Sequence, residues 1–262
     1  MQENINVKTM AQFASEGKEP DILYWVGCAG SFDARAIKVS KAFVKIMNEA
    51  GISFAILGNE ESCCGDPARR AGNEFVFQML ALQNIEVLKS YNIKKIVTAC
   101  PHGYNTLKNE YSKLGGNFEV IHHTQFIEQL IKDGKLKVDT KVLGDTKVTY
   151  HDSCYLGRVN GEYSAPRNIL NKAQISVTEM ERSAQNGLCC GAGGAQMFKE
   201  EEKGDKRINE ERAGEAIETG AKVIAANCPF CITMLEDGLK AHEKEDEIKV
   251  MDIAEILAKG IA

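Results

Sequence analysis

"KKIVTACPHG" (residues 94–103) and "KVIAANCPFC" (residues 222–231) are the two stretches that decide the fold. Each is a short apolar run that ends in Cys-Pro. A run of this length and composition is typical of a strand that is buried on both faces of a sheet. Proline suits the first turn of a helix, because its φ is already fixed and its missing N–H has no role there. Both stretches therefore predict a buried strand that leads directly into a helix.

The chain repeats itself around these two stretches. "DILYWVGC" (21–28) matches "KVTYHDSC" (147–154), and each is again an apolar, β-rich run that ends at a cysteine. The nine cysteines form two sets: Cys28, Cys63, Cys64 and Cys100, and then Cys154, Cys189, Cys190, Cys228 and Cys231. The first step spans 35 residues in both sets, and the step after the adjacent pair spans 36 residues in one and 38 in the other. Cysteines placed independently would not keep this register.

Helical patterns fill the spaces between these strands. Apolar residues recur at three- and four-residue steps over 36–50 and over 74–91, and a polar helix is expected over 205–219. Each half closes with a strand and a helix, at 118–134 and at 248–260. Strands that alternate with helices predict an α/β fold, here two tandem pseudo-repeat domains with mostly parallel sheets.

The same pattern divides the chain into three parts. We expect an N-terminal arm over 1–20, a first domain over 21–137 and a second domain over 145–262. The dense charge run "KEEEKGDKRINEER" (199–212) is expected to be a solvated loop and helix face.

Composition excludes several classes of protein. The chain has 262 residues, of which 44% are hydrophobic and 26% charged, and its net charge is −5. These values are ordinary for a globular protein and give no reason to expect nucleic acid or an anionic membrane surface as partner. No stretch approaches the roughly 20 apolar residues of a membrane span, and the start has no secretory signal pattern. We therefore expect a cytoplasmic protein, in which many cysteines indicate metal binding or redox chemistry more than disulfides.

Cys-Cys-Gly occurs twice, in "ESCCGDPARR" (61–70) and in "GLCCGAGGAQ" (187–196). Consecutive Cα atoms lie about 3.8 Å apart, whereas unstrained disulfides need roughly 4.4 to 6.8 Å, so neighbours do not pair without distortion. Two adjacent thiols that converge on one object need a turn, and a following glycine permits positive φ there. The second stretch is glycine-rich but lacks the Lys-Ser/Thr of a phosphate-binding loop. Each stretch therefore predicts a turn that aims two thiols at one centre.

A metal centre is the chemistry that this arrangement favours. Sites of open α/β sheets form beyond the carboxyl ends of the strands, which brings each cysteine set to one edge. Several thiolates held close together repel one another unless a cation offsets their charge. Tetrahedral zinc needs four ligands, so the five cysteines of the second set exceed it, whereas a multi-iron cluster has room for a fifth sulfur.

The doubled pattern of Cys, Cys-Cys-Gly and Cys-Pro-x-Cys resembles the cysteine-rich CCG domains of the heterodisulfide reductase B and D subunits. It is similar also to the iron–sulfur subunits of glycolate, lactate and anaerobic glycerol-3-phosphate oxidising complexes. The resemblance runs from Tyr24 onward. It implies a non-cubane [4Fe-4S] cluster on the second set, whose five members are Cys154, Cys189, Cys190, Cys228 and Cys231.

The first set departs from the family pattern at one position. Cys28, Cys63, Cys64 and Cys100 match, but Gly103 stands where the second half has Cys231. Three interpretations stay open: a second cluster on four cysteines, a substitute ligand, or a metal-poor pocket that faces the complete cluster. The candidate substitute ligands are His102, His122 and His123.

Four neighbours of the cysteines have two interpretations each. Arg69 and Arg70 are either solvated or bind an anionic substrate or tune cluster charge. His151 and Asp152 either support the metal centre or donate a proton to it, or only shape the turn before Cys154.

Function follows from the resemblance together with the residues. It implies an iron–sulfur electron-transfer subunit of a cytoplasmic oxidoreductase complex, which reduces a disulfide or passes electrons from a 2-hydroxy acid dehydrogenase or a similar enzyme. The chain lacks the C-x2-C-x2-C-x3-C-P run of ferredoxins, so a separate ferredoxin-like subunit or a flavoprotein is expected to supply electrons. Membrane association would then come through a partner. The alternative is a zinc-binding or metal-free structural or assembly protein that uses the same domains.

Overall fold

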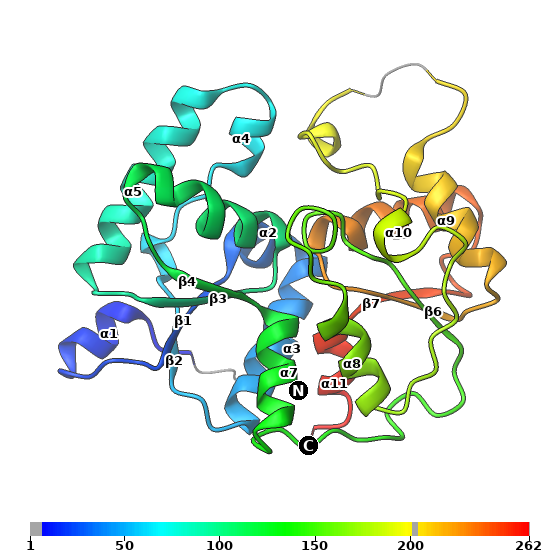
Figure 1. Cartoon of the computed structure of the whole chain (residues 1–262), viewed down its shortest axis with the longest axis horizontal. Coiled ribbons are helices and arrows are strands. Elements are labelled where there is room, and N and C mark those ends of the chain that lie inside the picture. Colours follow the sequence, from blue (N-terminus) through cyan, green and yellow to red (C-terminus); the bar gives the residue numbers. More distant parts are fainter. Residues whose placement is uncertain (1–6, 201–203, 262) are drawn as a thin grey trace. The chain divides into compact units, whose positions relative to one another are not determined.

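The computed structural model describes residues 7–200 and 204–261. The chain forms two compact units, the first ending at Lys137 and the second running from Val138 to Gly260 (Figure 1). Each unit is built on a parallel sheet of its own, with helices between the strands. The predicted fold class, tandem α/β repeats with parallel sheets, is confirmed. No helix among the described residues is long and apolar enough to cross a bilayer.

The first unit holds a four-stranded sheet in the order β2-β1-β3-β4. Its strands, all parallel, are β1 (Ile22–Trp25), β2 (Phe54–Ala55), β3 (Lys95–Thr98) and β4 (Glu119–His122). Trp25 pairs with Thr98, and Thr98 pairs with His122, so the last residues of three strands lie side by side. This register brings the loops after β1 and β3 to the same edge of the sheet.

The helices of the first unit follow its strands closely. They are α1 (Met10–Ser15), α2 (Gly27–Phe32), α3 (Ala34–Glu49), α4 (Asp66–Arg70), α5 (Glu74–Ser90), α6 (Pro101–Asn105) and α7 (His123–Lys132). α3 begins where the Asp33 carboxylate accepts a hydrogen bond from the Ala36 N–H, and it buries Val39, Phe43 and Ile46. In the view of Figure 1, α4 and α5 lie above β3 and β4, and α7 lies below them. The helices predicted over 36–50 and 74–91 are confirmed.

The described part of the predicted arm packs on this unit. Thr9 forms a parallel bridge to Ile56, and the Met10 N–H donates to the Ile56 carbonyl. The Met10 side chain is buried. Residues 1–6, the rest of that predicted arm, lie outside the described residues.

The second unit repeats this plan with one strand fewer among its described residues. Its parallel strands, in the order β5-β6-β7, are β5 (Val148–Tyr150), β6 (Val223–Ala226) and β7 (Lys249–Asp252). An isolated bridge between Val148 and Val177 stands beside β5, where the first unit has β2 beside β1. The His151 N–H donates to the Ala225 carbonyl at 2.9 Å, which continues the ladder one residue past β5.

The helices of the second unit are α8 (Ser164–Lys172), α9 (Ile208–Glu218), α10 (Pro229–Ala241) and α11 (Ile253–Ala258). α9 and α10 lie above β6 and β7 in Figure 1, and α8 and α11 lie below. The polar helix predicted over 205–219 is present as α9 and ends before Gly220, whose φ is +69°. The expected solvated face is wrong at two positions of this helix, because Arg212 is completely buried and Asn209 almost completely.

Candidate metal centres

The five cysteines of the second unit come from three loops at one edge of its sheet. Cys154 lies in the turns after β5, and Cys189 and Cys190 precede Gly191. Cys228 is the residue before the first turn of α10, and Cys231 lies within that turn. As the sequence predicts, Pro229 occupies the start of the helix, and Gly191 has a left-handed φ of +91°.

The sulfur atoms of these loops lie close together. The Sγ atoms of Cys154 and Cys189 are 3.9 Å apart. The Sγ atoms of Cys190 and Cys231 and one ring nitrogen of His151 all lie within 4.8 Å of one another, and this is the one such group of three among the described residues. The Gly191 N–H donates to the Cys189 Sγ at 3.3 Å. The edge of the sheet therefore carries a concentrated, largely buried sulfur site.

The protonation of these thiols is interdependent. The pKa of Cys189 lies far below its ordinary value, because the Cys154 and Cys190 thiols and the Gly191 N–H donate hydrogen bonds to its sulfur. The neighbouring Cys189 sulfur, together with burial, raises the pKa of Cys190, and the neighbouring Cys190 and Cys228 likewise raise the pKa of Cys231. One thiolate is thus favoured and further ones are disfavoured. Five thiolates at this site require a cationic centre.

The first unit builds the same arrangement from four cysteines. Cys28 lies in α2, Cys63 and Cys64 precede Gly65, and Cys100 is the residue before α6. Gly65 has a φ of +88°, and its N–H donates to the Cys63 Sγ at 3.5 Å. Hydrogen bonds from the Cys28 and Cys64 thiols lower the pKa of Cys63 to about 3. The first cysteine of each Cys-Cys-Gly is therefore the favoured thiolate in both units.

Gly103 lies in the first turn of α6, at the position that Cys231 occupies in α10. A Cβ atom added to Gly103 would lie 3.7 Å from the Thr98 Oγ1, 3.8 Å from the Cys100 Cβ and 4.0 Å from the Trp25 Cδ1. These are ordinary van der Waals distances, and the backbone of Gly103 is helical. The space around position 103 therefore accommodates a side chain, and no steric constraint among the described residues of the first unit excludes a fifth cysteine there.

The three histidines considered as substitute ligands each contact protein groups. The His102 Nδ1 lies 2.8 Å from the Asp66 Oδ2. The His122 Nδ1 lies 2.8 Å from the Thr124 Oγ1, and the His123 Nδ1 lies 3.3 Å from the His122 Nε2. None of the three joins a group of three or more close metal-ligand atoms within the part of the chain that the structure describes.

Asp66 is the centre of an ion-pair network. Besides His102, it accepts a hydrogen bond from the Arg70 Nε at 3.0 Å. Burial opposes its ionisation, but His102 and Arg70 together hold the pKa of Asp66 below its ordinary value. Arg69 and Arg70 both bind Glu110, Arg69 at 2.9 Å. Both arginines are thus engaged inside the first unit. The sequence offered no signal for Glu110, which lies some 40 residues further along the chain.

His151 and Asp152 diverge in the structure. Asp152 accepts two hydrogen bonds from Arg167, at 2.7 and 2.9 Å, and one from the Ala184 N–H at 2.7 Å. It therefore holds in place the segment that leads to Cys189. His151 instead has a ring nitrogen within 4.8 Å of the Cys190 and Cys231 sulfurs, and its side chain is completely buried.

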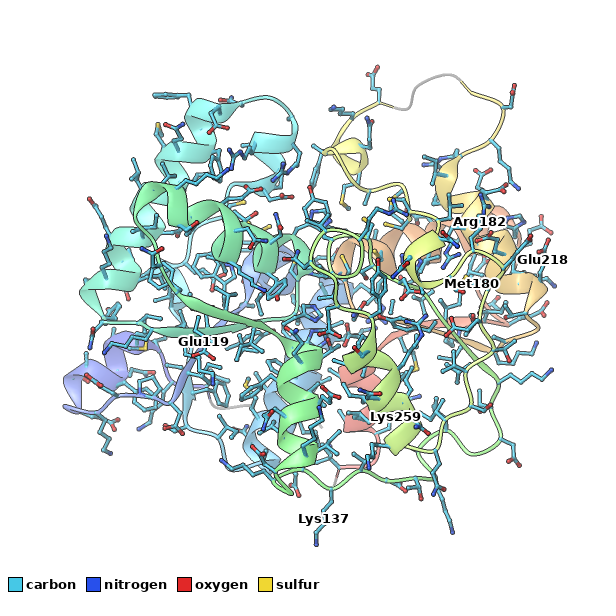
Figure 2. All side chains as sticks on the ribbon, viewed as in Figure 1. Glu119, Lys137, Met180, Arg182, Glu218 and Lys259 are labelled. Carbon is cyan, nitrogen blue, oxygen red and sulfur yellow. The ribbon has the colours of Figure 1, made fainter. Side chains whose placement is uncertain are left out.

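A buried arginine supports His151. The Arg212 Nε donates to the His151 Nδ1 at 3.0 Å, and the Arg212 Nη1 donates to the Arg182 carbonyl at 2.7 Å and to Glu215. Figure 2 shows Arg182 beside α9, to whose Glu211 and Glu215 it is paired. Burial, and then the nearby Arg212 charge, lower the pKa of His151 to about 3. The imidazole is therefore neutral at physiological pH.

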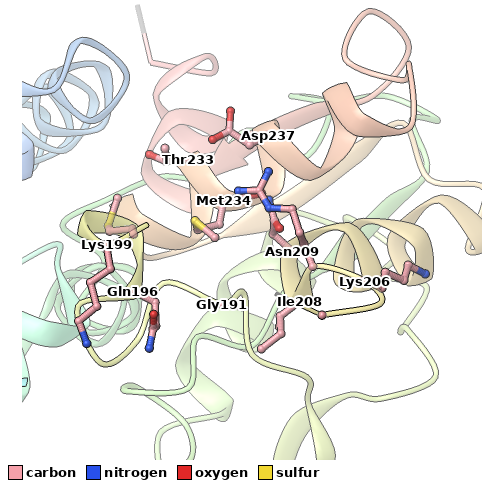
Figure 3. A pocket seen from close by; sticks show the side chains of 12 residues that line it. Gly191, Gln196, Lys199, Lys206, Ile208, Asn209, Thr233, Met234 and Asp237 are labelled. Atoms are coloured by element: carbon pink, nitrogen blue, oxygen red, sulfur yellow. The ribbon is translucent and has the colours of Figure 1, made fainter. Parts of the chain in front are cut away.

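A cavity of about 580 Å³ adjoins the Cys-Cys-Gly turn of the second unit (Figure 3). Gly191 forms part of its wall, together with Ile208 of α9 and Met234 of α10. Lys199 and Lys206 also line it, and Lys206 is paired with Glu211 at 2.7 Å. The turn that carries two of the cysteines is thus in contact with a cavity.

Comparison with known families agrees with this geometry. The cysteine-rich domain family, CCG, matches residues 22–108 and again residues 148–236. The chain belongs to this family, as its cysteine spacing predicts.

Three relatives give the match more detail. An EtfAB:quinone oxidoreductase of Syntrophomonas wolfei is 50% identical over 252 residues, which are 94% of this chain and 35% of the relative. A probable iron-sulfur-binding oxidoreductase of Bacillus subtilis, FadF, is 48% identical, with 97% and 36% covered. The D subunit of a dihydromethanophenazine:CoB--CoM heterodisulfide reductase of Methanosarcina barkeri is 36% identical, with 92% and 59% covered. The chain thus spans about a third of the length of the first two relatives.

Proposed function

We propose that this chain binds iron–sulfur clusters at the two cysteine sites and serves as an electron-transfer component of an oxidoreductase. The observation that carries the proposal is the convergence of five cysteine side chains from three loops of the second unit on one partly buried edge. The names of the relatives, an iron-sulfur-binding oxidoreductase and a heterodisulfide reductase component among them, support it.

The donor set fits a cluster. Its proposed ligands in the second unit are Cys154, Cys189, Cys190, Cys228 and Cys231, and those in the first unit are Cys28, Cys63, Cys64 and Cys100. The cysteines lie so close together that neighbouring sulfurs raise the pKa of Cys190 and Cys231. A positively charged iron core would offset this repulsion and allow the cysteines to bind as thiolates. A bound cluster, which we propose to be a non-cubane [4Fe-4S] cluster in the second unit, supplies one-electron transfer. The Gly65 and Gly191 N–H groups donate to the Cys63 and Cys189 sulfurs and would hold these two ligands in place.

The electron donor and acceptor of this component belong to the same proposal. We expect electrons to come from a ferredoxin-like iron–sulfur subunit or a flavoprotein, and to pass to a disulfide or along a chain that begins at a dehydrogenase. Two relatives are named as a quinone oxidoreductase and as a component of a heterodisulfide reductase, which supports a place within such an assembly. The cysteine sites at the sheet edges support this role.

Metal analysis tests the proposal directly. The chain is purified without oxygen, and iron, acid-labile sulfide and zinc are measured per chain together with the EPR spectrum before and after reduction. We expect iron and sulfide in similar amounts and an EPR signal that appears or disappears on reduction. Near-zero iron with stoichiometric zinc would overturn the proposal and favour the zinc-binding alternative. The reduction step separates a redox-active cluster from iron bound adventitiously.

A further inference from the structure

We propose that His151 donates a hydrogen bond from its Nε2–H to a sulfur of the metal centre in the second unit, and that Arg212 fixes the ring in the tautomer that allows it. The centre's identity rests on the proposed function. The role of His151 rests on the contacts of the chain itself, and it is that of a positioning and tuning residue for the redox centre.

The first step is the tautomer. An arginine guanidinium only donates hydrogen bonds, and here the Arg212 Nε donates to the His151 Nδ1 at 3.0 Å. The Nδ1 atom must therefore present a lone pair. An imidazole with a lone pair at Nδ1 is neutral and carries its single N–H at Nε2.

The second step is the direction of that N–H. The Nε2 atom of His151 is buried and has no hydrogen-bond partner among the described residues. Buried donors almost always have a partner, so one is expected here. A ring nitrogen of His151 lies within 4.8 Å of the sulfurs of Cys190 and Cys231, and Nδ1 is already occupied by Arg212. Because Nδ1 is already occupied, Nε2–H is the donor that the ring has left for these sulfurs.

The third step separates a donor from a ligand. To bind a metal through Nε2, the ring would need its lone pair there and its hydrogen at Nδ1. That hydrogen would point at the Arg212 N–H, so that two donors would face each other. Hydrogen bonds to the Arg182 carbonyl and to Glu215 hold the Arg212 guanidinium in this position. His151 thus acts on sulfur and not on the metal.

This contact has a redox consequence. Hydrogen bonds to cluster or cysteine sulfur stabilise the more negative, reduced state and raise the reduction potential. The first unit has Trp25 at the matching place, the strand end that pairs with Thr98. The two sites therefore differ in the side chain that the first strand of each unit contributes.

The experiment is a redox titration followed by EPR on the iron-loaded chain, with His151→Phe and His151→Gln compared. His151→Phe keeps a ring but removes the donor, and His151→Gln keeps an N–H donor. We expect His151→Phe to lower the potential of the second-unit centre by an amount equal to about a tenfold change in the equilibrium constant, which is about 59 mV for one electron. We expect His151→Gln to recover a part of that loss. His242→Phe, in which the lost ring nitrogen is bonded to the Glu210 carbonyl, is the matched control and should leave the potential unchanged.

Iron and sulfide contents decide between two failures. An unchanged potential in His151→Phe at unchanged iron and sulfide content overturns this inference and leaves the proposed function in place. A wild-type chain without iron overturns the proposed function instead. Should His151→Phe not fold, or iron be absent, the ¹⁵N NMR spectrum of His151 in the iron-free wild-type chain reports its tautomer. An Nε2–H signal is expected, and an Nδ1–H tautomer overturns the inference.

Discussion

The two units build their cysteine sites on the same backbone arrangement but surround them with different side chains. Both place a Cys-Cys-Gly turn with a left-handed glycine and a Cys-Pro helix start at the carboxyl edge of a parallel sheet. The matched positions around the sulfurs that differ include Trp25 against His151, His102 against Phe230, and Gly103 against Cys231. The backbone therefore determines that the sulfurs converge, and these side chains determine how many there are and what surrounds them.

The buried charges of the two units differ in the same way. In the first unit the buried polar partners are Asp66 and His102, which come from the Cys-Cys-Gly turn and the Cys-Pro helix. In the second unit Phe230 takes the place of His102 and packs against Phe198, and the buried cation is Arg212 of α9. The two units thus share the cysteine pattern, but their buried polar contacts come from different elements.

The largest expected effect comes from removing one sulfur in each unit. Cys190→Ser takes a buried thiol from the second site, and Cys64→Ser is the matched change in the first. If both units hold clusters, each variant loses about half of the iron, and Cys190→Ser abolishes the EPR signal of the five-cysteine site. Iron and sulfide analysis with EPR checks this. Loss of iron in Cys190→Ser alone would show that the first unit holds no cluster.

Next in size is the removal of the buried arginine. Arg212→Met leaves the buried Glu215 with Arg182 as its remaining ion-pair partner and the His151 Nδ1 without its donor. Breaking a buried ion pair in this way costs about 3–5 kcal/mol of the free energy of unfolding. Arg182→Met is the control, because that side chain is 39% exposed and solvent screens its ion pairs, so its loss should cost less than that of Arg212. Urea denaturation of both variants measures the difference, and equal losses would contradict the buried role of Arg212.

A smaller effect is expected from the network of the first unit. Asp66→Ala removes the carboxylate that contacts the buried His102 Nδ1 and should cost about 1–3 kcal/mol of the free energy of unfolding. The double variant Asp66→Ala with His102→Phe introduces the residue types that the second unit has at both positions, Ala192 and Phe230. A coupling energy of about 0.5–3 kcal/mol between the two changes is expected in a double-mutant cycle of urea denaturation. Additive losses would show that the contact between Asp66 and His102 contributes nothing to stability.

The smallest effect on stability is expected from Gly103→Cys. This variant also tests most directly why the two cysteine sites differ. The added Cβ meets only ordinary contacts, and replacing a helical glycine gains a few tenths of a kcal/mol, up to about 0.5. The first site then has five cysteines, so its EPR spectrum should move toward that of the second site. Gly103→Ala, which adds the Cβ without the sulfur, is the control. An identical spectrum in Gly103→Cys and Gly103→Ala would mean that the fifth position does not determine the type of centre.

The parts of the fold that depend on local pattern are those that the sequence predicts. The Cys-Pro helix starts and the glycine turns follow from residues next to one another, and the parallel sheets follow from the alternation of strands and helices. The contact between Arg212 and His151 joins residues 61 positions apart, and the one between Asp66 and His102 joins residues 36 apart. Only tertiary packing brings such groups together.

Arg212 illustrates why the charge pattern was misleading. It ends a run in which nearly every neighbour is charged, so periodicity gives it no apolar face to belong to. Yet α9 packs closely along α10, and the face of α9 that it buries includes Arg212 together with Ala213 and Ala216. The polar atoms of His151, the Arg182 carbonyl and Glu215 supply what a buried guanidinium needs.

The hydrogen bond from the Ser153 Oγ to the Asn227 Oδ1, at 2.8 Å, has a consequence for the order of assembly. Both residues immediately precede a cysteine of the second unit, and they are completely or almost completely buried. Together with the strand register, this bond ties the loops of Cys154 and Cys228 to each other through contacts that need no iron. In small zinc domains, by contrast, metal binding supplies much of the free energy of folding. In the second unit this buried hydrogen bond and the strand register hold two of the cysteine loops together through protein contacts alone, so we expect the iron-free chain to keep its fold.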